Sequence, residues 1–372
     1  SAYHEAALQP HLEEKVTALQ QEALRSLSHA YNRAPRHVAE ERMVHEVRRL
    51  DCNILPSDKS RRLVAIDSQT YAQSIEATKA GYQPVTRVPG PASVQARFNR
   101  ELASICSLYP DDSVISQALR RVKCSERTPS SLTNLPKDHK PGPTLKFKPL
   151  VGATNTPATQ LCKLLCDVLH PILGSLDTHI GSSAEFADAI RNERLLPGEH
   201  WGSLDVVNLY GSIPLTGRDN CFEVVGRYFE EQKNLTVFKD MTKDNFVRLL
   251  RLALGSDIIN IGGTAYRQKT GIAMGNNLSP TVAIIFMHFV ESKVKNSLPI
   301  RFWVRYVDDV FFIVRCSPEE LLQTANAAHV AIDFTYEAPE NNALPYLDML
   351  VVLETDSTFA FKLYIKPIHS GY

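Results

Sequence analysis

Residues 301–314 read RFWVRYVDDVFFIV, with the adjacent carboxylates Asp308 and Asp309 between two apolar runs. Both runs are rich in aromatic and β-branched residues, which predicts a strand, a tight turn and a second strand. Two ionised carboxylates beside an apolar core are unfavourable unless a positive charge lies near them. A divalent cation is the simplest such charge, and Mg²⁺ is usual where phosphates supply the other ligands. The alternative is an ordinary polar turn, in which Asp is common.

Length and composition set broad limits on the protein. The chain has 372 residues, enough for one large domain of two or three lobes or for two domains. Its net charge is zero, so a basic surface for nucleic acid has to be local. The seven cysteines follow no metal-site spacing, and no apolar run is long enough to cross a membrane. We therefore expect an intracellular protein with no membrane partner.

A second acidic site lies in residues 203–214, which read SLDVVNLYGSIP. We expect a strand that carries Asp205 and ends near Tyr210, followed by a helix that opens at Pro214. A lone Asp is unfavourable in a strand, which indicates a metal or a partner charge. If Asp205 lies beside Asp308, three carboxylates can hold two Mg²⁺ ions, with Mn²⁺ as a substitute, for in-line nucleotidyl transfer to a 3′-hydroxyl.

A glycine-containing loop opens residues 269–289, KTGIAMGNNLSPTVAIIFMHF. Gly271 and Gly275 allow the backbone to lie close against a flat ligand such as a base pair. Ser279 is expected to cap the apolar helix that follows, with Pro280 in its first turn.

Positive charge gathers between residues 120 and 148, where only Glu126 and Asp138 are acidic. Interspersed prolines predict a rigid extended hairpin suited to phosphate contacts, although a solvated loop is the alternative. The basic residues are Arg120, Arg121, Lys123, Arg127, Lys137, Lys140, Lys146 and Lys148. Upstream, residues 53–66 predict a further hairpin and residues 1–50 show helical periodicity.

Taken in order, these segments resemble a reverse transcriptase, and more closely the reverse transcriptase of Penelope-like retroelements. LPKDHKPGPTLKFKPLVG (135–152) is similar to the fingers hairpin, and LDVVNLYGSIP (204–214) to the first palm motif. TGIAMGNNLSP (270–280) is similar to the template-contacting motif, and RYVDD (305–309) carries the catalytic pair. Three further segments resemble the family: ILPSDKSRRLVAID (54–67), ENNALPYLDMLVV (340–352) and FKLYIKPIHS (361–370).

The resemblance implies an α+β, right-hand polymerase with fingers and a palm built on an antiparallel sheet packed on helices. It implies a helical N-terminal extension over 1–52, a fingers-like region over 53–175 and the palm over 176–372. We expect the thumb to be largely missing and the family's GIY-YIG endonuclease to be absent. The implied function is an RNA-directed DNA polymerase of a retroelement, nuclear in location, that uses two Mg²⁺ ions, an RNA template, a DNA primer and dNTPs.

The resemblance also assigns roles to residues. Asp205, Asp308 and Asp309 match the catalytic, metal-binding carboxylates, with the Val206 carbonyl as a further metal ligand. The implied nucleotide-binding residues are Lys137, Lys148, Tyr210 and Gly275, with Tyr210 as a steric gate that excludes a 2′-hydroxyl. The implied template and primer contacts are Lys140, Lys146, Asn276, Tyr306 and Lys366. Lys148 stands where the family has Arg, which replaces a bidentate fork by a point charge.

Three other interpretations remain open from the sequence. A telomerase-like or group II intron-like polymerase would use the same chemistry on another template. A decayed or domesticated fragment would bind nucleic acid without catalysis. A two-metal nuclease is disfavoured because it needs neither Tyr210 nor the basic hairpin.

Overall fold

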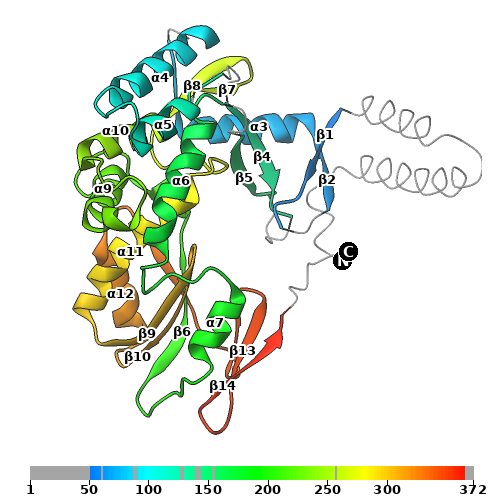
Figure 1. Ribbon diagram of the computed structural model, residues 1–372. Helices are drawn as coiled ribbons and strands as arrows, with labels where there is room; N and C mark the ends of the chain where they lie inside the picture. Colours follow the sequence, from blue (N-terminus) through cyan, green and yellow to red (C-terminus); the bar gives the residue numbers. More distant parts are fainter. Residues whose placement is uncertain are drawn as a thin grey trace, which may run out of the picture. The chain divides into compact units, whose positions relative to one another are not determined.

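A computed structural model describes residues 51–59, 62–86, 90–125, 130–138, 144–152, 156–255 and 258–364 (Figure 1). The helical extension predicted for residues 1–52 therefore lies outside the described residues, apart from its last two. The chain divides into two compact units. The first comprises residues 1–80, 133–150 and 366–372, and the second comprises residues 81–132 and 151–365.

The first unit is built on the predicted upstream hairpin. Strand β1 (Cys52–Pro56) pairs antiparallel with β2 (Leu63–Asp67), and α3 (Ser68–Lys79) follows directly. The Asp67 side chain caps α3 by accepting a hydrogen bond from the Thr70 amide at 2.7 Å. Strands β4 (Ser130–Pro136) and β5 (Phe147–Gly152) precede and follow residues 137–146 in the chain, and they are neighbours in one sheet. Asn134 holds β4 against α3, because its side-chain amide donates to the Ser74 and Thr78 hydroxyls.

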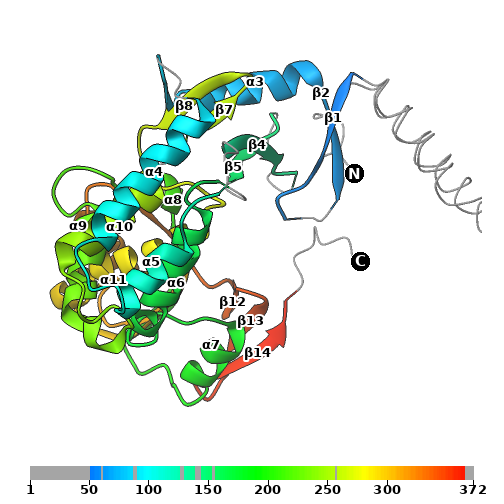
Figure 2. The ribbon, with the colours of Figure 1, turned by 45° about the horizontal axis from the view of Figure 1, so that its top comes forward.

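The second unit is mostly helical around one antiparallel sheet. Its helices are α4 (Pro91–Cys106), α5 (Val114–Arg121), α6 (Thr159–Leu173), α7 (Ser183–Ile190), α8 (Leu209–Ser212), α9 (Cys221–Gln232), α10 (Lys243–Gly255), α11 (Ser279–Ser297) and α12 (Pro318–Ala328), with a 3₁₀ turn at Lys233–Leu235. Helices α6, α9, α10 and α11 pack together into one group (Figures 1 and 2). None of the helices in the described part of the chain is long and apolar enough to cross a membrane.

The central sheet has four antiparallel strands in the order β11-β6-β10-β9. They are β6 (His200–Val206), β9 (Ile300–Tyr306), β10 (Asp309–Val314) and β11 (Phe334–Glu337). Side chains alternate between its two faces. On the helical face, Leu204, Val310 and Phe312 are fully buried in the core that α11 and α9 share. Because the other face is also covered, β10 reads as an uninterrupted apolar run.

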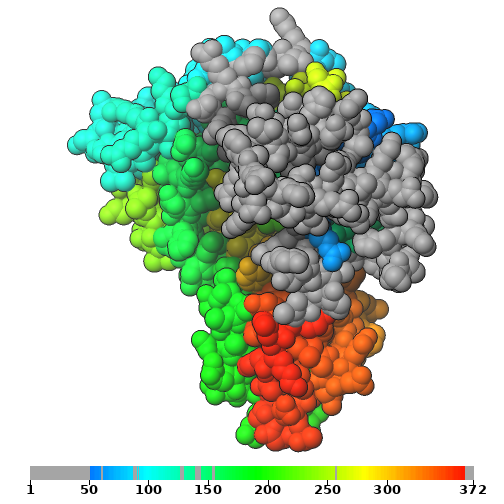
Figure 3. Space-filling model, turned by 90° about the vertical axis from the view of Figure 1, so that its right-hand side faces the viewer, coloured from blue at the N-terminus to red at the C-terminus, as the bar shows by residue number. Residues whose placement is uncertain are grey.

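A small sheet covers that other face. Strands β12 (Ala343–Tyr346), β13 (Met349–Leu353) and β14 (Phe359–Leu363) form antiparallel pairs, and with α7 they bury Trp201, Phe311 and Ile313 of the central sheet. Figure 3 shows the orange and red residues of this sheet gathered beside green residues of the α7 region. The three remaining strands of the second unit, β3 (Tyr82–Pro84), β8 (Thr264–Gln268) and β7 (Ile259–Ile261), pair antiparallel in that order. The predicted α+β class, with an antiparallel sheet packed on helices, is confirmed.

Two local predictions are corrected. Strand β6 ends at Val206 and not near Tyr210, because Asn208 takes a left-handed conformation and starts the short helix α8. No helix opens at Pro214. The next long helix, α9, begins at Cys221, where the Asn220 side chain accepts hydrogen bonds from the amides of the first turn.

Candidate active site

The predicted hairpin of residues 301–314 is present, and its turn is unusual. Strands β9 and β10 are joined by only two residues, Val307 and Asp308, with Tyr306 opposite Asp309. Val307 has φ of +54°, a left-handed conformation that is unfavourable for a β-branched side chain. Asp308 does not share the positive φ, so the turn has the pattern of type II′. The carboxylates thus sit at a turn that the chain would not adopt without support.

Strand β6 brings the second acidic site to this turn. In the antiparallel register of β6 and β10, Asp205 lies directly opposite Asp309. The Val206 amide donates to the Asp308 carbonyl at 3.0 Å, so Asp205 and Asp309 form the closer, non-hydrogen-bonded type of pair. Asp308 is the neighbour of Asp205 considered from the sequence, whereas the register makes Asp309 the residue directly opposite. Asp205 is exposed and Asp309 is half-buried.

The Cβ atoms of such a pair lie about 5 Å apart, so both carboxylates can approach one cation. Among the described residues, no group of three or more His, Cys, Asp or Glu side chains is gathered closely enough to hold a metal. The carboxylates therefore offer part of a coordination shell and not a closed cage. That donor set fits Mg²⁺, which commonly takes one or two carboxylates and completes its shell with substrate phosphates and water.

Tyr210 is within electrostatic reach of Asp308. It belongs to α8, immediately after the turn that ends β6, and it is half-buried. Burial raises the pKa of its hydroxyl, and the negative charge of Asp308 raises it further. Tyr210 therefore keeps its proton at neutral pH. Its backbone is also fixed, because the Ile272 amide donates to the Tyr210 carbonyl at 2.8 Å.

The glycine loop packs on this same backbone. Gly271 has φ of +74°, and a Cβ added there would lie 2.6 Å from the Tyr210 carbonyl oxygen and 2.6 Å from the Gly211 Cα. Only glycine allows this approach. Gly275 also has a positive φ, of 104°. The loop thus supports the Tyr210 segment, a role that its position between the acidic motifs did not reveal.

Asn276 and Ser279 have structural contacts that differ from those expected. Asn276 is 4% exposed, and its side-chain oxygen accepts from the Leu278 amide at the start of α11. Ser279 is the first residue of α11 and not its capping acceptor, because its hydroxyl donates to the Ala273 carbonyl at 2.7 Å. The predicted template contact of Asn276 stays a prediction, with the amide oxygen already bonded.

The predicted triphosphate-binding lysines lie in the first unit. The Lys148 ammonium contacts the Asp58 carboxylate at 2.9 Å, and the Asp58 side chain is nearly buried. The Lys137 amide donates to the Lys146 carbonyl at 2.8 Å, which ties the residue after β4 to the residue before β5. Lys146 is exposed. Lys140 and Lys366 lie outside the described residues, and the roles predicted for all five lysines stay predictions.

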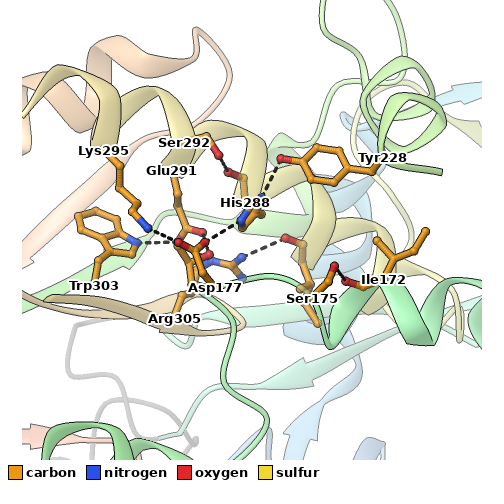
Figure 4. Close-up of polar contacts among 12 residues, drawn as sticks. Ile172, Ser175, Asp177, Tyr228, His288, Glu291, Ser292, Lys295, Trp303 and Arg305 are labelled. Carbon is orange, nitrogen blue, oxygen red and sulfur yellow. Dashed lines mark hydrogen bonds and ion pairs between the residues drawn. The ribbon is translucent and has the colours of Figure 1, made fainter. Parts of the chain in front are cut away.

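Sequence reasoning missed a buried ion pair behind the turn. Arg305 of β9 and Glu291 of α11 are both 0% exposed, with the Arg305 Nε 2.7 Å from a Glu291 carboxylate oxygen (Figure 4). The sequence contains a signal for this pair. Arg305 lies two residues after Trp303, and therefore on the strand face where an apolar residue is expected. Also not identified from the sequence is Tyr346, which is 3% exposed and whose hydroxyl donates to the Asp309 carbonyl at 2.9 Å.

Comparisons with known proteins bear on the fold. No protein-family model matches the chain, and no curated protein matches its sequence. An apo telomerase from Candida tropicalis is similar in structure, with a TM-score of 0.57 and 12% identity, over 86% of this chain and 57% of that chain. A telomerase from Candida albicans, solved in complex with a fragment of telomeric RNA, gives a TM-score of 0.56 and 12% identity over 89% and 57%. A C. tropicalis telomerase truncated of its C-terminal domain gives 0.50 and 14% over 83% and 63%.

These similarities establish a reverse-transcriptase-like polymerase fold. The chain spans 57% to 63% of the telomerase chains that it matches. At 12% to 14% identity the likeness concerns the fold alone. The closer resemblance to Penelope-like retroelements stays a prediction from the sequence.

Proposed function

We propose that this chain is a nucleotidyltransferase that adds deoxynucleotides to a primer 3′-hydroxyl on an RNA template. The observation that carries the proposal is the register pair of Asp205 and Asp309, with Asp308 on the adjoining turn. Carboxylate oxygens gathered at one end of a sheet are the ligands that a hard divalent cation takes, which supports a bound cation at this place. The polymerase-type fold around these residues supports the same conclusion.

Asp205, Asp308, Asp309 and the Val206 carbonyl would hold two Mg²⁺ ions, or Mn²⁺, together with oxygens of a nucleoside triphosphate. When bound, such ions acidify an attacking 3′-hydroxyl and stabilise the charge on leaving pyrophosphate. The contribution of the chain itself is orientation. The β6–β10 register holds Asp205 and Asp309 opposite each other, and the two-residue turn holds Asp308 next to them.

Tyr210 is proposed as the group that selects the sugar. The charge of Asp308 acts on its hydroxyl and raises its pKa, and its backbone is held by the Ile272 amide. A fixed aromatic ring beneath the sugar leaves no space for a 2′-hydroxyl, so deoxynucleotides are favoured. Because burial keeps the phenol neutral, this selection acts by shape and not by charge.

The partners proposed are an RNA template, a DNA primer and dNTPs. The telomerase from Candida albicans was solved with a fragment of telomeric RNA, which supports RNA as a partner for the same fold. A Penelope-like retroelement and a nuclear location rest on the sequence motifs alone. In this proposal Lys137 and Lys148 contact the triphosphate, and Lys148 exchanges its Asp58 partner for a phosphate.

One alternative uses the same fold without its chemistry. A decayed copy would bind nucleic acid without catalysis. Such a binding module would hold template-primer equally well with and without Mg²⁺. Its binding would still weaken with salt, because phosphate contacts release counterions.

The decisive experiment is primer extension on an annealed RNA template and DNA primer, with the four dNTPs compared with the four rNTPs. We expect extension with dNTPs that requires Mg²⁺ and falls by at least about 100-fold in Asp308→Asn. Asp188→Asn, at an exposed position of helix α7, is the matched control and should extend as the wild type does. Salt-sensitive binding without any extension would favour the decayed copy, and extension that survives Asp308→Asn would reject the proposed site.

A further inference from the structure

The two-residue turn between β9 and β10 needs an external restraint. Its first residue, Val307, is β-branched and has φ of +54°. Turns of this kind usually place glycine at that position, because other residues are strained there. The two possible hairpin turns, types I′ and II′, differ by a flip of the central peptide unit, here the Val307–Asp308 peptide. A flip would turn the Asp308 backbone and with it the direction of the carboxylate.

The Arg305 guanidinium is bonded in three directions. Its Nε donates to Glu291 at 2.7 Å, its Nη2 donates to the Ile284 carbonyl of α11 at 3.0 Å, and its Nη1 donates to the Val307 carbonyl at 2.9 Å. The last bond reaches the central peptide of the turn. Figure 4 shows Arg305, Glu291 and Trp303 converging between α11 and β9.

Glu291 is fixed as firmly as Arg305. One carboxylate oxygen accepts from Arg305 and from the Trp303 indole at 3.0 Å, and the other accepts from the Thr178 hydroxyl at 2.7 Å. The strand is also held at its backbone, since the Arg305 amide donates to the Thr178 carbonyl at 2.7 Å. The guanidinium thus has a single rigid orientation, and its fork aims Nη1 at the turn.

We propose that Arg305 is a positioning residue that locks the Val307–Asp308 peptide and thereby aims the Asp308 carboxylate. A buried ion pair is a poor way to gain stability, because well-packed apolar residues of the same volume often stabilise a core as well or better. Its value here lies in the third bond, which no apolar side chain would supply. This inference rests on the proposed function for its consequence in catalysis, but the restraint on the turn stands on geometry alone.

Tyr346 acts on the opposite face of the same hairpin. Arg305 shares the helical face with Val310 and Phe312, whereas Tyr346 belongs to the small sheet that covers the other face. Its hydroxyl donates to the Asp309 carbonyl, immediately after the turn. The turn is therefore bonded from both faces, and the Tyr346 hydroxyl offers a second, gentler perturbation of the same restraint.

The test compares Arg305→Lys and Tyr346→Phe with matched controls in the full chain. Lysine keeps the charge near Glu291 but loses the fork that reaches Val307. Arg301→Lys, at the other end of β9, breaks a comparable fork to Glu199 without touching the turn. Tyr336→Phe removes a hydroxyl from β11 of the same sheet. Two readouts are needed: hydrogen exchange of the peptide that covers residues 303–312, followed by mass spectrometry, and the Mg²⁺ concentration that gives half-maximal primer extension.

We expect faster exchange of residues 303–312 in both test variants and in neither control. We also expect the Mg²⁺ midpoint to rise about 10- to 100-fold in Arg305→Lys, as for other residues that orient metal ligands. A smaller folded fraction would lower the amplitude at every Mg²⁺ concentration without moving the midpoint. Should Arg305→Lys fail to fold, Glu291→Gln replaces it, because it keeps the shape of the Arg305 partner and weakens the bond that orients the guanidinium.

Unchanged exchange and an unchanged Mg²⁺ midpoint in the test variants would overturn the inference. If the wild type extends no primer, the proposed function fails, and the exchange measurement still decides whether Arg305 holds the turn. If extension occurs but exchange in the turn is the same in all variants, only the positioning role is rejected.

Discussion

Replacing Gly271 by alanine should damage the site through one close contact. A Cβ at this position would lie 2.6 Å from the Tyr210 carbonyl oxygen, 2.6 Å from the Gly211 Cα and 2.7 Å from the Gly211 carbonyl oxygen. All three are backbone atoms, so none can move aside by a change of rotamer. The new methyl group must push the glycine loop away from Tyr210, or the loop must leave its left-handed conformation.

Two separate contributions lower the free energy of unfolding of Gly271→Ala. A non-glycine residue in the left-handed region costs about 1–2 kcal/mol, offset by about 0.4–1 kcal/mol because alanine restricts the unfolded chain. Forcing a methyl group into a filled space costs a further 1–3 kcal/mol, roughly. Gly217 has a similar φ of +84° and nothing within 4 Å of an added Cβ, so Gly217→Ala carries only the first contribution. We expect Gly271→Ala to lose about 1–3 kcal/mol more than Gly217→Ala.

The assay is urea unfolding of both variants beside the wild type. The urea midpoints are compared provided that the dependence of the unfolding free energy on urea is the same in all three proteins. Primer extension then shows whether the displaced Tyr210 backbone changes the selection between dNTPs and rNTPs, which we expect only for Gly271→Ala. Equal midpoints for the two alanine variants would refute the reasoning, because the steric term would then be absent. A selective loss of stability without any change in sugar selection would mean that the loop supports the fold but not the gate.

The remaining predictions concern the candidate site. Tyr210→Val should raise rNTP incorporation by about tenfold or more, since a smaller side chain leaves space for the 2′-hydroxyl, and single-nucleotide insertion kinetics measure this ratio. The wild-type ratio should stay flat between about pH 6 and 9, because the raised pKa of Tyr210 keeps the phenol neutral; a ratio that changes with pH would contradict a purely steric gate.

The sequence was most informative where one short segment carries its own pattern. Both strands around Asp308 and Asp309 follow from their aromatic and β-branched residues, and the structure confirms them as β9 and β10. The hairpin of β1 and β2 follows in the same way from two apolar runs and a polar turn. The α+β class and the polymerase-like fold followed from the order of the motifs, which no single motif would have given.

The register between distant strands could not be read from the sequence. That Asp309 and not Asp308 lies opposite Asp205 depends on a pairing between residues about a hundred positions apart, and a slip of one residue would reverse every side chain. The same limit applies to Tyr346, whose bond to Asp309 requires the small sheet to cover one particular face. The family resemblance implies Asn276 as a template contact, and only the structure reveals that its side-chain oxygen accepts from the Leu278 amide at the start of α11.

The site concentrates features that are each unfavourable by local rules. Asp205 and Asp309 place like charges in register, Val307 takes a left-handed conformation, and Arg305 is a fully buried charge. Natural sequences break local rules mainly where function requires it, and the surrounding structure then has to hold the strained part in place. Here the central sheet is buried on both faces, by α11 and its neighbours on one side and by α7 with β12–β14 on the other. A hairpin packed on both faces cannot relax by twisting away from either core, so its strained turn and opposed carboxylates stay where a cation and a triphosphate would need them.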